Sequence, residues 1–114
     1  MARITIENSV LSNNVNMITL KGSLDAHAAE ELRTFLGRLY ENKKYNLIYD
    51  LSNIDYISSA GVAVILDSYN TATDNNGNVV ILNPSKMARD VLNMIGVTQI
   101  VQCVNTKEEA LKLF

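Results

Sequence analysis

Hydrophobic residues recur with two different periods along the chain and divide it into alternating elements. Two segments near the amino terminus, 4–10 and 15–24, are rich in strand-forming residues, which predicts two strands joined at the turn-favouring pair Asn13-Asn14. From Asp25 onward, helical and strand patterns alternate to the end of the chain. This order is typical of an α/β fold with a mostly parallel central sheet.

Apolar spacing and capping residues predict about four helices and about five strands. The first helix is expected from the cap Asp25 to about residue 41, and the second from the serine pair at 58–59 to about residue 75. A third should open at Pro84-Ser85 and end at Gly96, and a capping box of Thr106 and Glu109 should start the fourth. The remaining strands are expected at 45–51, 78–82 and 99–104, and residues 1–114 are expected to form one domain.

The same spacing predicts which side chains turn inward. The third helix should bury one apolar stripe, and the methionines should fill gaps in the core or at its edge. The single cysteine lies in an apolar stretch, where it should be buried and inert. The residues concerned are Ala88, Val91, Leu92 and Ile95 for the stripe, Met17, Met87 and Met94 for the gaps, and Cys103.

The most informative segment is YNLIYDLSNIDYISSAGVAVIL, residues 45–66. Two adjacent hydroxyls, Ser58 and Ser59, follow a predicted loop over 54–59, at the carboxyl end of a strand where sites gather in parallel sheets. A helix that begins here could hold a phosphate at its amino end. Gly61 costs this helix about 1 kcal/mol relative to alanine. Close approach of a partner's backbone would explain it, and packing of the helix start against the sheet is the alternative.

Composition excludes several classes of function. The net charge of −2 offers no basic patch, so we expect no direct nucleic-acid partner. No apolar run reaches membrane-spanning length and no export signal is visible, so we expect no membrane partner and a location in the cytoplasm. The one cysteine agrees with a reducing compartment.

Catalytic and metal chemistry also lack a pattern. His27 is the only histidine, and no second histidine or cysteine cluster accompanies it as a metal ligand. The serines are not flanked by a Gly-x-Ser-x-Gly elbow, and no glycine-rich phosphate loop occurs. We therefore expect no enzyme activity, no metal and no cofactor.

Two short stretches resemble the signature of the STAS domain, in particular of bacterial anti-sigma factor antagonists. Residues 50–52, Asp-Leu-Ser, and 58–66, SSAGVAVIL, fall on that family's pattern of Asp-Leu-Ser followed by Asp-Ser-Ser/Thr-Gly-Leu-Gly. Residues 21–25, KGSLD, resemble its Gly-Glu-Leu/Ile-Asp. The chain departs from the pattern at Ser58, where the family has Asp, at Ala60, where it has Ser or Thr, and at Ser23, where it often has Glu.

The resemblance implies a phosphorylation switch at Ser59. The unphosphorylated chain would bind an anti-sigma factor that is also a serine kinase, and so release a sigma factor. Phosphorylation would end that binding, and a PP2C-type phosphatase would restore it. An alternative is a STAS binding module within a transport, lipid-trafficking or stress-signalling complex. The partner surface is expected at the start of the second helix and the turn beside it: Asp25, Ser58, Ser59, Ala60, Gly61 and Val62.

Overall fold

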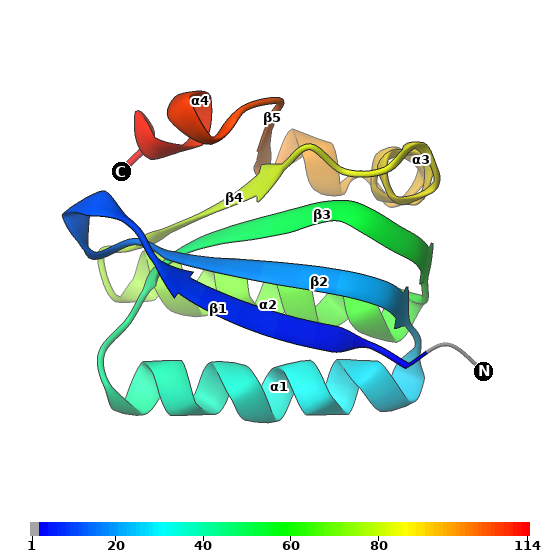
Figure 1. The fold of residues 1–114 in the computed structure, drawn as a ribbon, viewed down its shortest axis with the longest axis horizontal. Coiled ribbons are helices and arrows are strands. Elements are labelled where there is room, and N and C mark those ends of the chain that lie inside the picture. Colours follow the sequence, from blue (N-terminus) through cyan, green and yellow to red (C-terminus); the bar gives the residue numbers. More distant parts are fainter. Residues whose placement is uncertain (1–2) are drawn as a thin grey trace.

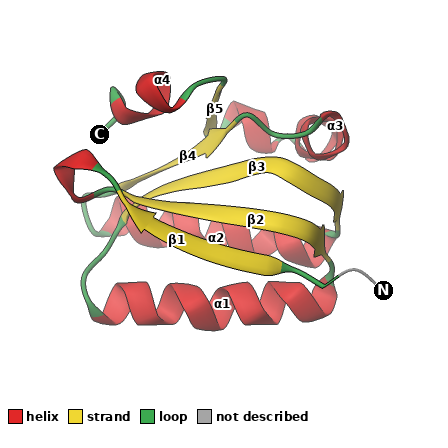
Figure 2. Cartoon of the chain, in the orientation of Figure 1, coloured by secondary structure: helices red, strands yellow, loops and turns green. Residues whose placement is uncertain are grey.

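A computed structural model, which describes residues 3–114, contains one five-stranded sheet in the order β1-β2-β3-β4-β5 (Figures 1 and 2). β1 is antiparallel to β2, and the other neighbouring strands are parallel. The expected α/β fold, with a mostly parallel sheet and four helices in the described residues, is therefore confirmed. The strands are β1 Thr5–Val10, β2 Asn16–Leu24, β3 Asn46–Ile57, β4 Asn78–Leu82 and β5 Gln102–Val104, and the helices are α1 Ala26–Glu41, α2 Ser59–Asp74, α3 Lys86–Ile95 and α4 Lys107–Leu111.

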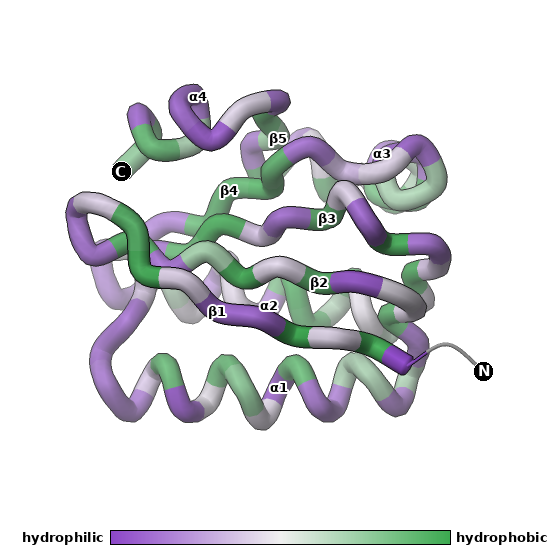
Figure 3. The backbone as a smooth tube through the Cα atoms, viewed as in Figure 1, coloured by the Kyte–Doolittle hydropathy of each residue, from purple (hydrophilic) through white to green (hydrophobic). Residues whose placement is uncertain are grey.

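The sheet separates two apolar layers. α1 and α2 lie together below it in Figure 1, and their inward stripes pack on alternate residues of the strands, such as Tyr49 and Leu51 of β3. Ile48, which precedes Tyr49 and faces the opposite side of the sheet, packs with Val80 and with Ala110 of α4. Figure 3 shows hydrophobic and hydrophilic positions alternating along α1, as one buried face requires.

Residues with positive φ angles lie at predicted turns and helix ends. Asn13 and Asn14 both have φ of 59°, a conformation that asparagine tolerates well, and they form a short 3₁₀ turn between β1 and β2. Gly96 has φ of 90° and ends α3 in the left-handed conformation. No helix in residues 3–114 has the length and apolarity needed to cross a membrane.

β3 is longer than predicted, because the loop expected over 54–59 is mostly strand. β3 continues to Ile57, and its second half pairs with residues 21–24 of β2 across two register shifts. Ile54 and Ile57 are buried, and the hydroxyl of Ser85 donates to the carbonyl oxygen of Ile54 at 2.7 Å. Residues 53, 55 and 56 are exposed, although all three belong to β3 and do not form a loop.

The carboxyl-terminal third differs from expectation in side-chain burial and in the start of the last strand. A 3₁₀ turn, Val97–Gln99, precedes β5, which is only three residues long. Met94 is 82% exposed and Ile95 is 49% exposed, so neither fills the core; both lie in the last turn of α3, next to the Gly96 cap. Cys103 is half-buried and not fully enclosed.

Candidate functional site

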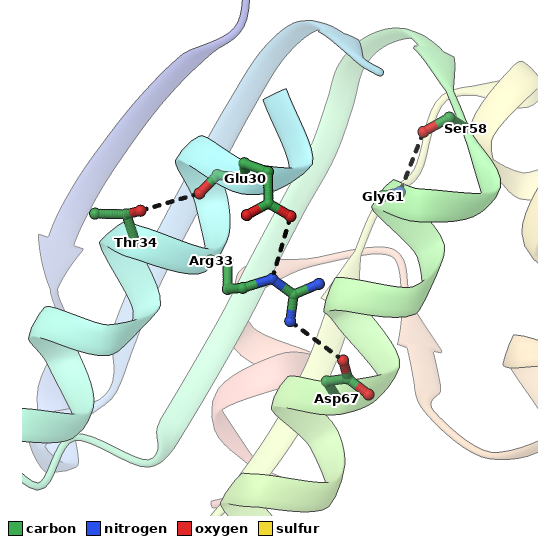
Figure 4. A network of polar contacts seen from close by, with 6 residues as sticks. All are labelled: Glu30, Arg33, Thr34, Ser58, Gly61 and Asp67. Carbon is green, nitrogen blue, oxygen red and sulfur yellow. Dashed lines mark hydrogen bonds and ion pairs between the residues drawn. The ribbon is translucent and has the colours of Figure 1, made fainter. Parts of the chain in front are cut away.

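Ser58 is the residue that caps α2. Its Oγ accepts a hydrogen bond from the Gly61 amide at 3.1 Å, which Figure 4 shows, and donates to the Leu24 carbonyl oxygen at 3.1 Å. The Ser58 amide donates to the same Leu24 oxygen at 2.9 Å. The Ser58 hydroxyl is therefore committed to the helix cap and to the end of β2.

Ser59 is the first residue of α2, and its side chain is exposed. Within residues 3–114 its hydroxyl makes no side-chain hydrogen bond. The amide groups of Ser59 and Ala60 lie in the first turn, where no preceding helical carbonyl can accept from them. A hydroxyl at this position is accessible, and a negative charge on it would meet the positive end of the helix.

Gly61 and Val62 belong to the interior, which corrects their expected place on the partner surface and favours the second explanation of the glycine, packing of the helix start against the sheet. A Cβ built on Gly61 would lie 2.7 Å from Leu24 Cγ and 2.9 Å from the Leu24 carbonyl oxygen. Val62 is 2% exposed and packs in the core. The glycine therefore lets α2 pack closely on the end of β2, and the space is occupied by Leu24 and not open to a partner's backbone.

Asp25 caps α1 at the same end of the sheet. Its carboxylate accepts the Ala28 amide at 2.8 Å, and it directly follows Leu24, whose carbonyl holds Ser58. Asp25 is half-buried. The turn before α1 and the start of α2 are thus joined through one carbonyl group, and the expected surface residues Asp25, Ser59 and Ala60 lie on these two connected segments.

A second carboxylate at this end was missed by sequence reasoning. Asp55 Oδ1 accepts a hydrogen bond from the Ser23 hydroxyl at 2.8 Å, between β3 and β2. Asp55 is exposed and precedes the serine pair by only a few residues. The apolar residues Ile54 and Ile57 were the available signal, because two apolar side chains in an expected loop indicate a segment that packs on the core.

A small cavity adjoins the Asp25 turn. Its volume is about 280 Å³, and it lies between the amino end of α1 and the segment before β1. Ile4 and Ala28 supply apolar walls, while carboxylates and cations stand around them. The complete lining is Arg3, Ile4, Ser23, Asp25, His27, Ala28 and Glu31.

The surface beside Ser59 continues along α1 and α2 as exposed charge. Arg33 Nη1 lies 3.5 Å from Asp67 Oδ2 and its Nε lies 3.5 Å from Glu30 Oε1, so a cation bridges the two helices (Figure 4). His27, 84% exposed, lies 3.2 Å from Glu31. These pairs are exposed, and such pairs contribute little to stability.

Groups with shifted pKa values lie away from the serine pair. Burial raises the pKa of the Tyr49 hydroxyl, whose 2.7 Å hydrogen bond to Ser68 opposes that rise only in part. Burial also raises the pKa of the Cys103 thiol, which keeps it protonated and unreactive at neutral pH. In residues 3–114 no three His, Cys, Asp or Glu side chains are grouped so as to hold a metal ion.

Comparison with known proteins identifies the fold and the family. The chain is 28% identical over 81 residues to the anti-sigma F factor antagonist of Lysinibacillus sphaericus, covering 70% of this chain and 69% of that protein. It resembles the structure of the anti-sigma factor antagonist SpoIIAA in its unphosphorylated form, with a TM-score of 0.82, 24% identity and coverage of 96% of this chain and 95% of the other. The structure of the Bacillus cell fate determinant SpoIIAA in the phosphorylated form matches with a TM-score of 0.74, at 24% identity over 96% of this chain and 98% of the other. The model of the STAS domain family matches residues 8–110, and the chain belongs to that family.

Proposed function

We propose that this chain is an anti-sigma factor antagonist that is switched by phosphorylation of Ser59. In its unphosphorylated form it binds an anti-sigma factor with serine kinase activity in the bacterial cytoplasm, which frees a sigma factor. The observation that carries the proposal is the contrast within the serine pair. Ser59 offers an exposed hydroxyl at the start of α2, whereas the Ser58 hydroxyl is already engaged with Gly61 and Leu24.

The proposed binding surface is the end of the sheet at which α2 begins. Asp25, Ser58, Ser59 and Ala60 supply groups that a partner can reach, and Asp55 extends this surface across β3. Gly61 and Val62 act from inside, by fixing how close α2 lies to β2. The separation between accessible residues and the buried residues that hold them in place supports a rigid, preformed surface. On this surface the hydroxyl of Ser59 is the group that can be modified.

Phosphate on Ser59 should stop binding through charge. It adds about −1.5 to −2 charges at neutral pH. The amino end of α2 tolerates that charge locally, so the fold should persist. A partner surface shaped for a neutral serine beside the carboxylates of Asp25 and Asp55 would then face an unpaired dianion.

In this proposal the chain itself catalyses nothing. The kinase activity belongs to the anti-sigma partner and the reversal to a PP2C-type phosphatase.

The proposal is tested by phosphorylation in vitro with the anti-sigma factor kinase from the same organism and ATP, followed by mass spectrometric mapping. We expect one phosphate on Ser59, no product with Ser59→Ala, and a phosphorylated product with Ser58→Ala. Modification of Ser58 alone, or of neither serine, would contradict the proposal. Binding of the kinase to the chain, measured by titration before and after phosphorylation, should fall by at least about tenfold, or 1.4 kcal/mol.

A further inference from the structure

The second half of β3 contains an extra residue relative to β2. Ile54 lies opposite Gly22 and Tyr56 lies opposite Ser23, so Asp55 has no partner residue in β2. Such a β-bulge is rare between parallel strands, and bulges beside functional sites redirect a side chain. Here the bulged residue, Asp55, is exposed although the residue before it, Ile54, is buried in the core.

A hydrogen bond from the neighbouring strand holds the Asp55 carboxylate in place. The Ser23 hydroxyl donates to Oδ1 of Asp55 at 2.8 Å. Among residues 3–114, no hydrogen-bond donor reaches Oδ2, so this oxygen is available to a donor on another molecule. A side chain that is already ordered loses less conformational entropy when it binds.

No cation in the described part of the chain neutralises Asp55. The ion pairs of residues 3–114 use other carboxylates, namely those of Glu7, Glu30, Glu31, Asp67 and Asp90. Asp25, at the adjacent strand end, is also outside these ion pairs. This end of the sheet therefore presents uncompensated negative charge, and the side chain that complements it is a cation.

Asp55 is close enough to Ser59 for one partner to cover both. It precedes Ser59 by four residues, so their Cα atoms are at most about 14 Å apart. A typical interface covers about 800 Å² of each protein, which is a patch roughly 30 Å across. Tyr56, the residue after Asp55, is 49% exposed, and tyrosine is enriched at interfaces. A kinase that binds over Ser59 therefore also reaches the Asp55 carboxylate.

We propose that Asp55 is a specificity-determining residue of the Ser59 surface, and that its carboxylate pairs with a lysine or arginine of the anti-sigma kinase. This inference rests on the proposed function and adds the chemistry by which the partner is recognised. Ser23 is a positioning residue, because it acts only through Asp55. An exposed charge of this kind mainly raises the association rate, and its effect falls as salt screens it.

The test measures the rate and affinity with which the purified kinase binds the full chain, with ADP in place of ATP so that Ser59 stays unmodified. Asp55→Asn removes the charge but keeps an acceptor for Ser23. At low salt it should weaken binding by about threefold to fivefold, mostly through slower association. In about 1 M salt, where the screening length is about 3 Å, the difference should fall below about twofold. Asp55→Glu keeps the charge and should bind nearly as wild type does.

Asp74→Asn is the matched control, because it changes the net charge by the same amount. Asp74 is exposed and is the last residue of α2, at the opposite end of that helix from Ser59. This variant should associate with the kinase as fast as wild type. Equal slowing by Asp74→Asn and Asp55→Asn would overturn the inference, because net charge alone would then explain the rate.

A double-mutant cycle tests the role of Ser23. Ser23→Ala should slow association by about twofold in the wild-type chain and should have no further effect in Asp55→Asn, since one residue acts through the other. Circular dichroism checks that each variant is folded. Additive losses in the double variant would overturn the positioning role of Ser23.

The outcomes separate this inference from the function on which it rests. A kinase that binds wild type and Asp55→Asn equally well at low salt would overturn the role of Asp55 and leave the proposed function standing. A loss in Asp55→Asn that is the same at low and high salt would overturn it as well. A kinase that neither binds the wild-type chain nor phosphorylates Ser59 would overturn both.

Discussion

At the scale of the residue, two neighbouring serines with the same side chain have different environments. The backbone of Ser58 is still extended, so its hydroxyl can turn back to the Gly61 amide, whereas Ser59 has entered the helix and faces solvent. The sequence pattern predicted a helix start at this pair, and the structure shows that Ser58 is the cap. The contact with Leu24 depends on a strand far away in the chain, so no local pattern could reveal it.

The first prediction separates these two environments by stability. Ser58→Ala removes the cap and a bond to β2, and should lower the free energy of unfolding by about 1–2 kcal/mol. Ser59→Ala is the matched control and should change it by less than about 0.5 kcal/mol, as an exposed substitution does. Urea unfolding followed by circular dichroism measures both. Equal losses in the two variants would show that the two hydroxyls have the same structural role.

The second prediction concerns charge at Ser59. Ser59→Asp places a carboxylate at the amino end of α2, where it is favoured by about 0.3–1 kcal/mol. The melting temperature should therefore stay close to that of wild type, while affinity for the anti-sigma partner falls. Calorimetric titration and a melting curve measure the two quantities, with Ser59→Asn as the uncharged control. A clear loss of stability without loss of affinity would contradict a switch by surface charge.

At the scale of the element, the helices were predictable from their capping residues and apolar stripes. The second half of β3 was not, because it pairs with a strand that is distant in the sequence. The predicted starts at Asp25, the serine pair 58–59, Pro84-Ser85 and Thr106 are confirmed, because each is a short-range signal, and Ser58 is the member of the pair that caps α2. The second half of β3 is held by β2 on one side and by Ser85 on the other. Its exposed polar residues therefore resembled a loop, and Asp55 was missed with them.

The close contact between α2 and β2 gives the third prediction. Gly61→Ala adds a methyl group less than 3 Å from Leu24, and should destabilise the chain by about 1–3 kcal/mol even though alanine favours a helix. Gly37→Ala, where a Cβ meets nothing within 4 Å, is the control and should be neutral or stabilising. Urea midpoints compare them. A stabilised Gly61→Ala variant would mean that Leu24 yields easily, and that the glycine is not needed for packing.

At the scale of the whole molecule, the two faces of the sheet are covered unequally. α1 and α2, sixteen residues each, cover one face, whereas the five-residue α4 and the last residues cover part of the other. The alternation of helices and strands predicted a mostly parallel central sheet, but it did not indicate which helices cover which face. The small layer that covers Ile48 and Val80 was harder to predict from the sequence, because the length of β5 and the placement of α4 depend on tertiary contacts.

The fourth prediction tests the smaller layer. Ala110 is fully buried against Val80 and Ile48, so Ala110→Asp would bury an unpaired carboxylate and lower stability by about 2–4 kcal/mol. Lys107→Ala, on the exposed side of α4, is the control and should change little. Thermal unfolding measures both. A small loss in Ala110→Asp would show that α4 detaches readily and contributes little to the fold.

The shared bond to Leu24 has a consequence for how a modifying enzyme reads this chain. In an unfolded polypeptide the serines at 58 and 59 are adjacent, flexible and chemically alike. Only after β2 and α2 have docked does the Leu24 carbonyl occupy one hydroxyl and leave the other free. Phosphorylation confined to Ser59 therefore indicates a folded chain, whereas a chain that is modified before it folds should carry its phosphate on either serine.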